Sequence, residues 1–450
     1  MAGETRALAE FASTLRYEDI PASVIAITKT CLIDTVGVAL FGSGLPWSRS
    51  VEHFARQTAA QGASTILSAS LPQVSAPAAA LANGTFAHAF ELDNLRQPSA
   101  GVHPGATAHV AALAVAQAQK ASGRDFLTAL VAACECMLRI GLAARQTSEQ
   151  LGFHAPGLTG VFGSAIAASR LLGHDGQRTA MALGIGGSFC SGLLAFAKAG
   201  NGAMVKRLHM GRAAEGGVVA ATLAGSGFEG PDVVLEGKFG FLDVYARDGD
   251  PALLVEGLGT RWDSLNIRFK MFPCHVTAQA PVRAIRQLAR EHGFDAHQVA
   301  RLVIEAGEKV LTHHADREPH DVGTAQYSVP FCVALALFRD PSEPQAFLDG
   351  PQQNPRILDL CRRIELQPLH EGGQGGRKKP TCRLAVTLGD GRSYAIDDSG
   401  WQDDSDEALQ ERVTRKYLQL TADFSDPWRA AVLKRLQSIE RENLAELFAN

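Results

Sequence analysis

The chain has 450 residues, of which 46% are hydrophobic and 20% are charged, and its formal net charge at pH 7 is −4. These values are ordinary for globular proteins and exclude disordered and fibrous classes. The small excess of acidic groups argues against a nucleic-acid partner, and the sequence shows neither a secretory signal nor an apolar run typical of a membrane span, so we expect a cytoplasmic protein without a membrane partner.

The first 260 residues repeat Ala, Leu, Val and Gly at helical spacing. This pattern predicts a helical domain over residues 1–262, with small residues where helices approach closely. The clearest helices are predicted at residues 21–40, 76–90, 106–121, 125–144, 160–172 and 211–225. The glycine-rich run 184–190 follows no predicted strand and lacks the third spaced glycine of a dinucleotide loop, so it does not indicate a cofactor.

A mixed pattern begins near Trp262 and predicts an α+β domain over residues 263–400, followed by C-terminal helices over residues 401–450. The predicted elements are a helix at 278–292, a strand at 302–306, a helix at 325–338, a hairpin of strands 382–388 and 392–396, and helices at 406–420 and 426–448. Residues 371–380 read as a flexible basic loop. We predict a mainly α protein: a large helical domain with an inserted smaller α+β lid, whose C-terminal helices return to the helical domain across an interdomain cleft.

The cysteine and histidine spacings do not indicate a metal site. Eight cysteines are scattered through apolar runs, and the nearest pair, Cys134 and Cys136, has the wrong spacing for a redox or zinc motif. His313 and His314, with Asp316 and His320 nearby, form no recognisable ligand spacing and are read as a polar loop. We predict reduced cysteines, no metal and no cofactor.

The segment from Glu91 to Gly105 joins two predicted helices and is the first candidate for a functional site. It contains two carboxylates, an arginine and a histidine, while Pro98, Gly101 and Pro104 prevent a continuous helix. Polar side chains on a loop between rigid helices are typical of active sites. His103, beside these carboxylates in a His-Pro-Gly turn, is the strongest single candidate.

Four further polar blocks occur at helix ends or loops, at residues 152–160, 205–214, 269–277 and 324–330. With the opening loop, these blocks resemble the MmgE/PrpD family, which includes 2-methylcitrate dehydratase, cis-aconitate decarboxylase and iminodisuccinate epimerase. The similarity spans nearly the whole chain and rests on four ordered motifs: an Ala-His, acidic, His-Pro block at 87–105, Gly-Phe-His at 152–154, Lys-x-Leu-His-x-Gly at 206–211, and Lys-x-Phe-Pro at 270–273. The resemblance implies a helical domain with a smaller α+β lid, a homodimer, and a metal-free site between the domains.

The activities of this family share a carbanion formed beside a carboxylate, which must be stabilised by cations and hydrogen-bond donors. By resemblance, the catalytic residues are Asp93, His103, His154, Lys206, Lys270 and Tyr327. The histidines and the phenol can move protons, and Lys206, Lys270 and Arg212 can attract a small anionic carboxylate substrate. Further candidates for substrate binding are Glu91, Asn94, Arg96, His209, Arg212 and His275, although His209 and His275 could equally pack against the chain or orient the lysines.

The chain departs from the family in its acidic block, where the common Asp-Phe-Asp-Asp-Thr is replaced by Glu91-Leu92-Asp93-Asn94-Leu95. One carboxylate has become an amide and the threonine hydroxyl is absent. We expect this change to alter how a leaving hydroxyl or a distal carboxylate is held. It favours a polycarboxylate other than methylcitrate or cis-aconitate, or an isomerase.

Three functions remain open from the sequence. The leading hypothesis is a cofactor-independent lyase that dehydrates or decarboxylates a small di- or tricarboxylate. The second is an epimerase or isomerase of a dicarboxylate, which needs two opposed acid/base groups such as His103 and His154 or Lys206. The third is a noncatalytic ligand-binding paralogue, suggested by the altered Asn94-Leu95 pair and opposed by the retention of His103, His154, Lys206 and Lys270.

Overall fold

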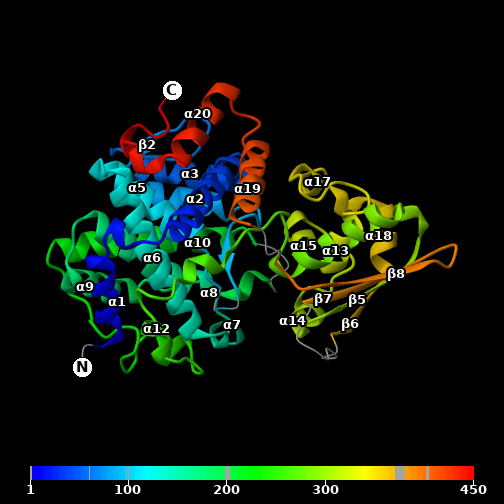
Figure 1. The fold of residues 1–450 in the computed structure, drawn as a ribbon, viewed down its shortest axis with the longest axis horizontal. Helices are drawn as coiled ribbons and strands as arrows, with labels where there is room; N and C mark the ends of the chain where they lie inside the picture. Colours follow the sequence, from blue (N-terminus) through cyan, green and yellow to red (C-terminus); the bar gives the residue numbers. More distant parts are fainter. Residues whose placement is uncertain are drawn as a thin grey trace. The chain divides into compact units, whose positions relative to one another are not determined.

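The computed structural model describes residues 3–59, 61–97, 99, 101–197, 203–369, 381–401 and 405–449. The chain divides into two compact units (Figure 1). The first comprises Met1–Ala89, Asp93–Phe269 and Ser405–Asn450, and the second comprises Phe90–Leu92 and Lys270–Asp404. Helix predominates over strand, which confirms the prediction of a mainly α protein. A lid role for the α+β part stays a prediction.

The first unit is built almost entirely of helices. Its α-helices are α1 (Glu4–Thr14), α2 (Ala22–Ser43), α3 (Pro46–Thr58), α4 (Ala76–Ala87), α5 (Val110–Gln119), α6 (Gly123–Ala144), α7 (Thr147–Gln150), α8 (Ala155–Leu171), α9 (Gly176–Gly187), α10 (Val205–Gly225), α11 (Phe241–Tyr245), α12 (Ala252–Val255), α19 (Asp406–Leu420) and α20 (Asp426–Gln437). Two short antiparallel pairs add β1 (Ser64–Thr65) with β2 (Gln73–Val74) and β3 (Leu95–Arg96) with β4 (Ile267–Arg268).

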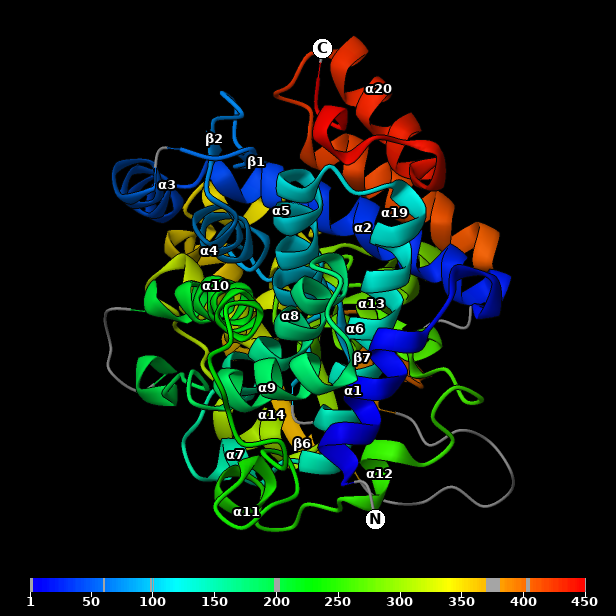
Figure 2. The ribbon, with the colours of Figure 1, turned by 90° about the vertical axis from the view of Figure 1, so that its left-hand side faces the viewer.

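Helix α8 lies at the centre of this unit, with α6 on one side and α10 on the other (Figure 2). Helix α10 also packs closely on α4. The two backbones approach so nearly that a Cβ atom on Gly84 would lie 2.9 Å from the Cα of Gly211. Small residues therefore allow the close helix contacts that the composition predicts, and they bring the end of α4 beside the start of α10.

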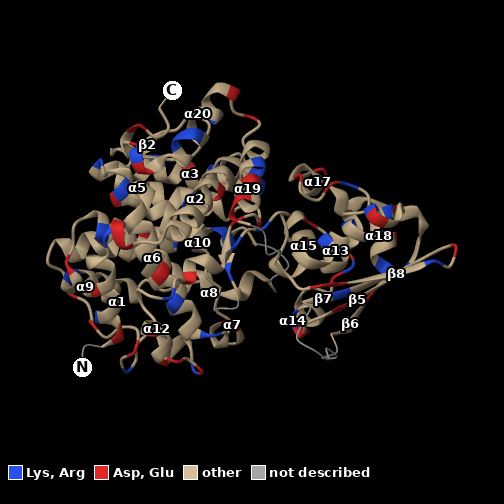
Figure 3. Ribbon diagram, viewed as in Figure 1, with Lys and Arg blue, Asp and Glu red and all other residues tan. Residues whose placement is uncertain are grey.

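Helices α2 and α6 are long and apolar enough to cross a membrane by composition alone, contrary to the expectation that no segment is. However, 78% and 94% of their most apolar windows are buried inside the protein. Both helices therefore lie mostly within the core of the first unit. Lysine and arginine are interspersed with aspartate and glutamate along the elements of both units (Figure 3).

The second unit contains a four-stranded sheet in the order β6-β5-β7-β8. Strand β5 (Val299–Ala306) pairs in parallel with β6 (Ile364–Pro368) and antiparallel with β7 (Cys382–Leu388), which pairs antiparallel with β8 (Ser393–Asp398). The α-helices of this unit are α13 (Val276–His292), α14 (Glu308–His313), α15 (Val322–Tyr327), α16 (Val329–Leu335), α17 (Gln345–Leu348) and α18 (Pro355–Arg362). Helix α13 packs on β7 and β8.

Most predicted elements are present, including the hairpin of β7 and β8, but several boundaries were wrong: α8 begins at Ala155 rather than residue 160, and α10 begins at Val205 rather than residue 211. The single helix expected at 325–338 is two helices, because the Ser328 hydroxyl accepts a bond from the Phe331 N–H and caps α16. The helix expected to reach residue 90 ends at Ala87, and Glu91 has a φ of 56°. Helix α20 ends at Gln437 rather than residue 448. The predicted loop at 371–380 lies outside the described residues.

Candidate functional site

The loop after α4 is held in place by short backbone pairings. Strand β3 pairs with β4, and the Arg96 N–H donates to the Val102 carbonyl at 3.0 Å, which closes the tip of the loop. The chain then turns at Pro104 into a π-helical segment, Gly105–His109, that continues into α5. The His103 side chain thus stands on a short turn between this closed loop and a helix.

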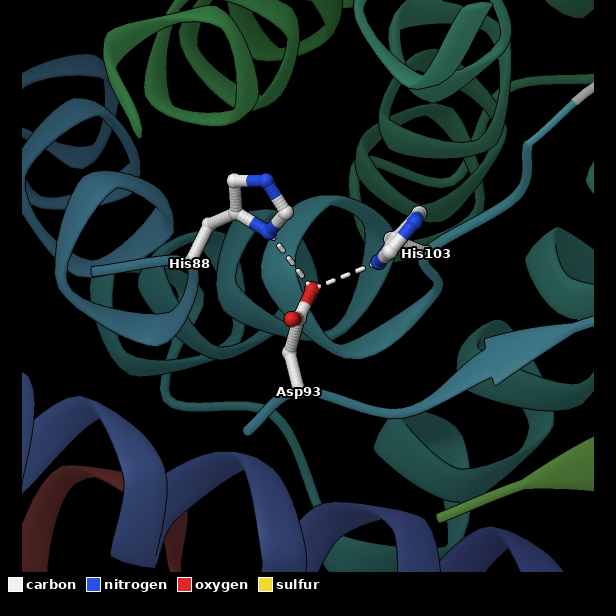
Figure 4. A group of neighbouring side chains, drawn as sticks. All are labelled: His88, Asp93 and His103. Atoms are coloured by element: carbon white, nitrogen blue, oxygen red, sulfur yellow. Dashed lines mark hydrogen bonds and ion pairs between the residues drawn. The ribbon is translucent and has the colours of Figure 1, made fainter. Parts of the chain in front are cut away.

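His88, Asp93 and His103 form a buried hydrogen-bonded group, which we call the His-Asp-His cluster (Figure 4). Nδ1 of His88 lies 2.8 Å and Nδ1 of His103 lies 2.6 Å from the same Asp93 oxygen, Oδ2. Because a carboxylate oxygen accepts, both rings donate through Nδ1. The basic nitrogen of each imidazole is then Nε2, and Nε2 of His103 makes no hydrogen bond to any of the described residues.

These residues are also a group whose possible metal-ligand atoms all lie within 4.8 Å of one another. However, each Nδ1 is at hydrogen-bond distance from Asp93 Oδ2, while ligands bound about 2.0 Å from a tetrahedral ion stand roughly 3.3 Å apart. A metal would also require the two Nδ1 atoms to lose the protons that they donate. The contacts therefore fit shared protons better than a metal ion.

A second pair of histidines adjoins the cluster. His154 directly precedes α8, and its Nδ1 lies 3.0 Å from Nδ1 of His209 on α10. Burial, together with the positive charge of Lys206, lowers the pKa of His154 well below its usual value and that of His209 to about 4. Both rings are therefore neutral at pH 7. The ring centroids of His154 and His88 are 6.0 Å apart, so the pair lies beside the cluster.

The first unit therefore brings together five of the predicted site residues, Asp93, His103, His154, Lys206 and His209, and adds His88, which the sequence did not single out as a site residue. They come from the end of α4, the following loop, the start of α8 and the first turns of α10. The outermost of these residues, His88 and His209, lie 121 positions apart in the sequence. The close packing of α10 on α4 and α8 is what gathers them.

His109, at the end of the π-helical segment, gives a test of the buried histidines. Burial lowers its pKa from 6.5 to about 4, and its Nδ1 lies 3.6 Å from the Cys31 sulfur. Between pH 6.5 and 4 the His109 ring is protonated in the unfolded chain but stays neutral in the native protein. The free energy of unfolding therefore falls by up to about 3 kcal/mol as the pH is lowered through this range.

We expect His109→Gln to make the dependence of the unfolding free energy on pH shallower between about pH 6.5 and 4. Urea unfolding at several pH values measures this slope. The matched control is His53→Gln, which removes a histidine that the fold leaves exposed. An equal slope in wild type and His109→Gln would mean that the His109 ring is protonated in the native protein.

The second unit holds another group of polar side chains, which we call the lysine–tyrosine cluster: Glu91, Lys270, His275, His314 and Tyr327. The Lys270 ammonium donates to a Glu91 carboxylate oxygen at 2.9 Å, and both side chains are almost fully buried. The ring of His275 lies 4.2 Å from that of His314 and 4.9 Å from that of Tyr327. Burial, with His314 nearby, lowers the pKa of His275 well below its usual value.

Three predicted binding residues of the first unit make bonds to other parts of the protein. The Asn94 amide is fully buried and bonded to the protein. Arg96 is buried and donates to Asp263 at 3.2 Å. Arg212 is exposed and pairs with Glu215, so it does not join the other groups around Lys206. A substrate contact by any of the three stays a prediction.

Two residues of the second unit show what sequence reasoning missed. Gln279 on α13 holds the turn after Lys270: its Oε1 accepts from the Met271 N–H at 3.1 Å and its Nε2 donates to the Phe272 carbonyl at 2.8 Å. Its position inside an ordinary helix carries no local signal. His314, expected in a polar loop, is instead buried, and its ring lies in tilted contact with the rings of His275 and Tyr327.

Comparison with known proteins identifies relatives over most of the chain. The MmgE/PrpD N-terminal domain model matches residues 6–254 and the MmgE/PrpD C-terminal domain model matches residues 272–438. A cis-aconitate decarboxylase of Aspergillus terreus is 26% identical over 458 residues, covering 96% of this chain and 92% of that protein. The cis-aconitate decarboxylase of Homo sapiens is 27% identical, covering 82% and 78%. A cis-aconitate decarboxylase-like protein of Aspergillus oryzae is 29% identical, covering 69% and 67%.

Proposed function

The chain belongs to the MmgE/PrpD family, and we propose that it is a cofactor-independent lyase that decarboxylates a small unsaturated di- or tricarboxylate. The named relatives support decarboxylation over dehydration. The observation that carries the proposal within this structure is the His-Asp-His cluster, in which one buried carboxylate orients two imidazoles. The same arrangement is suited to moving a proton to or from carbon.

Decarboxylation requires one acid, which protonates the carbon that loses carbon dioxide. When the carbon–carbon bond to a carboxylate breaks, carbon dioxide leaves and the electron pair stays on the remaining carbon. That carbon must then receive a proton. His103 supplies it from Nε2 in its protonated form, while Asp93 keeps Nδ1 protonated and stabilises the imidazolium before the proton leaves; water restores the proton afterwards.

The surroundings of the cluster favour an anionic substrate. Lys206 is buried beside the neutral rings of His154 and His209, so its charge is little screened by solvent. The start of α8 adds the partial positive charge of a helix N-terminus. Together these groups would bind a substrate carboxylate and stabilise the charge left on carbon, with His154 as a neutral hydrogen-bond donor.

The changed residues at positions 94 and 95 do not argue against cis-aconitate as the first substrate to test. The Asn94 amide is bonded to α2 and to the backbone after His103, and Leu95 is buried in β3. A substrate hydrogen bond from Asn94 would require it to give up these contacts. The burial of these two side chains therefore removes the main reason to expect a polycarboxylate other than cis-aconitate.

The deciding experiment is proton NMR of the purified protein in deuterated water with cis-aconitate, methylcitrate, citrate and iminodisuccinate. We expect loss of a substrate carboxylate as carbon dioxide and incorporation of one deuteron at carbon. Dehydration would appear as a new alkene without loss of carbon. Exchange or inversion without net loss would replace the proposal by an epimerase, and the absence of change across the panel would contradict both enzymes.

We also expect turnover to persist after metal removal. The acid/base groups assigned here need only the protons that they share. Dialysis against EDTA followed by the same assay should leave kcat within about twofold of the untreated protein, a change of less than about 0.5 kcal/mol in the barrier. Loss of activity with EDTA and its recovery with added Zn²⁺ would contradict the metal-free mechanism.

A further inference from the structure

Asn94 lies directly after the carboxylate of the His-Asp-His cluster, but its side chain is fully buried. The amide nitrogen donates to Asp34 Oδ2 at 2.9 Å and lies 3.3 Å from the Thr35 hydroxyl. The amide oxygen accepts from the Gly105 backbone N–H at 2.9 Å. The two ends of one amide thus join α2 to the turn that follows His103.

Asp34 on α2 is itself part of a buried ion pair. The Lys416 ammonium on α19 donates to the other carboxylate oxygen, Oδ1, at 2.7 Å. The exposed fractions are 0% for the Asp34 side chain and 8% for that of Lys416, so the pair is shielded from water. Burial raises the pKa of Asp34, and Lys416 and Asn94 oppose that rise. One negative and one positive charge therefore lie behind the loop.

The turn after His103 is tightly packed where the Gly105 N–H meets the Asn94 amide oxygen. A Cβ atom added to Gly105 would lie 2.6 Å from the Asn94 nitrogen and would also collide with Thr35. The Thr107 hydroxyl donates to the His103 carbonyl at 2.8 Å, which ties the same turn to the π-helical segment. Because Gly105 is two residues after His103, a shift of its N–H moves the backbone that carries the imidazole.

We propose that Asn94 is a positioning residue, whose amide links the Asp34–Lys416 ion pair to the Gly105 N–H and thereby holds His103 against Asp93. The chemistry explains why an amide suits this place. An amide donates and accepts at the same time and at every pH. A carboxyl group could make both bonds only while protonated, since an ionised one cannot donate to Asp34.

Asn94→Asp, a substitution of nearly equal size, tests the proposal through pH. The titratable groups that face position 94 and Asp34 are Lys416 on α19, Cys31 on α2, Asp93 on the loop, and His109, which contacts Cys31. Burial beside the Asp34 carboxylate raises the pKa of the introduced carboxyl above the unfolded value of about 3.9. Stability is therefore lost as the pH rises through that raised pKa, since the unfolded chain ionises first.

The readout is the NMR spectrum of ring-labelled histidine, with the His103 signal identified by its loss in His103→Gln. In Asn94→Asp we expect a His103 signal like that of wild type at low pH, and a displaced or broadened signal once the introduced carboxyl ionises. This readout needs no substrate. The inference rests on the proposed function only for the role of His103, so a protein that turns over no carboxylate could still pass this test.

Asn83→Asp is the matched control. Asn83 is also fully buried and also makes bonds at both ends of its amide, but these go to the Leu67 N–H and the Thr65 carbonyl. Its variant should lose stability without disturbing His103. An Asn94→Asp protein that is folded from pH 5 to 8 with a wild-type His103 signal throughout would overturn the proposal.

The double variant Asp34→Asn with Asn94→Asp exchanges the amide and the carboxylate and keeps one buried carboxylate near Lys416. It should restore the His103 signal at neutral pH, because the amide at position 34 can donate to the carboxylate at position 94. This double variant also tests the proposal if the Asn94→Asp protein does not fold. A folded double variant whose His103 signal stays displaced at every pH would overturn the proposal.

Discussion

His103→Gln should lower kcat by about 10² to 10⁴, the range that a positioned acid/base group contributes. His103 donates to Asp93 through Nδ1, and its Nε2 makes no bond to the described residues, so this nitrogen can reach a substrate. Glutamine approximates the size of the ring but cannot exchange a proton near neutral pH. The substrate identified by NMR, assayed for carbon dioxide release at saturating concentration, measures the loss.

The same replacement at His88 supplies a comparison within the cluster. His88 donates to the same carboxylate oxygen, at 2.8 Å, but lies at the end of α4 rather than on the turn. His88→Gln should lower kcat less than His103→Gln, because Asp93 still orients His103. A larger loss in His88→Gln would reverse the two roles, and wild-type kcat in His103→Gln would exclude it as the acid.

Asp93→Asn should also lower kcat by about 10² to 10⁴, although the protein keeps a group of the same shape. The amide oxygen can still accept from both imidazoles, but it carries no negative charge. The imidazolium form of His103 then loses the charge that stabilises it before proton donation. Parallel assays of kcat and of thermal unfolding separate this electrostatic loss from a loss of folding.

A double variant distinguishes a shared role from two separate ones. If Asp93 acts through His103, Asp93→Asn combined with His103→Gln should lower kcat no more than about the worse single variant, since groups that act as a unit are strongly non-additive. Losses that multiply in the double variant would mean that Asp93 contributes to the reaction independently of His103.

The lysine–tyrosine cluster shows how far local signals reach. The resemblance to the family identifies Lys270 and Tyr327 as site residues. The residues that contact and position them, however, belong to no recognisable motif. Gln279 holds the turn after Lys270, and the ring of His314 contacts that of His275. Hydrogen bonds between residues several turns apart, or on different helices, leave no periodic pattern in the chain.

The sequence by itself determined the helical character of the first unit, the hairpin of β7 and β8, and the loop that carries His103. Helical spacing, turn residues and prolines act over a few residues, so they can be recognised locally. The sequence also indicated the family, because four motifs occur in the same order along the chain.

Only the tertiary structure decided which polar groups meet. It placed Asp93 between two histidines, left Arg212 exposed beside Glu215, and turned Asn94 away into a bond with Asp34. The physical reason is that burial and partner choice depend on helix packing between segments far apart in the chain. Asp34, Asn94 and Lys416 are separated by up to 382 positions, and only the packing of α19 on α2 joins them behind the loop.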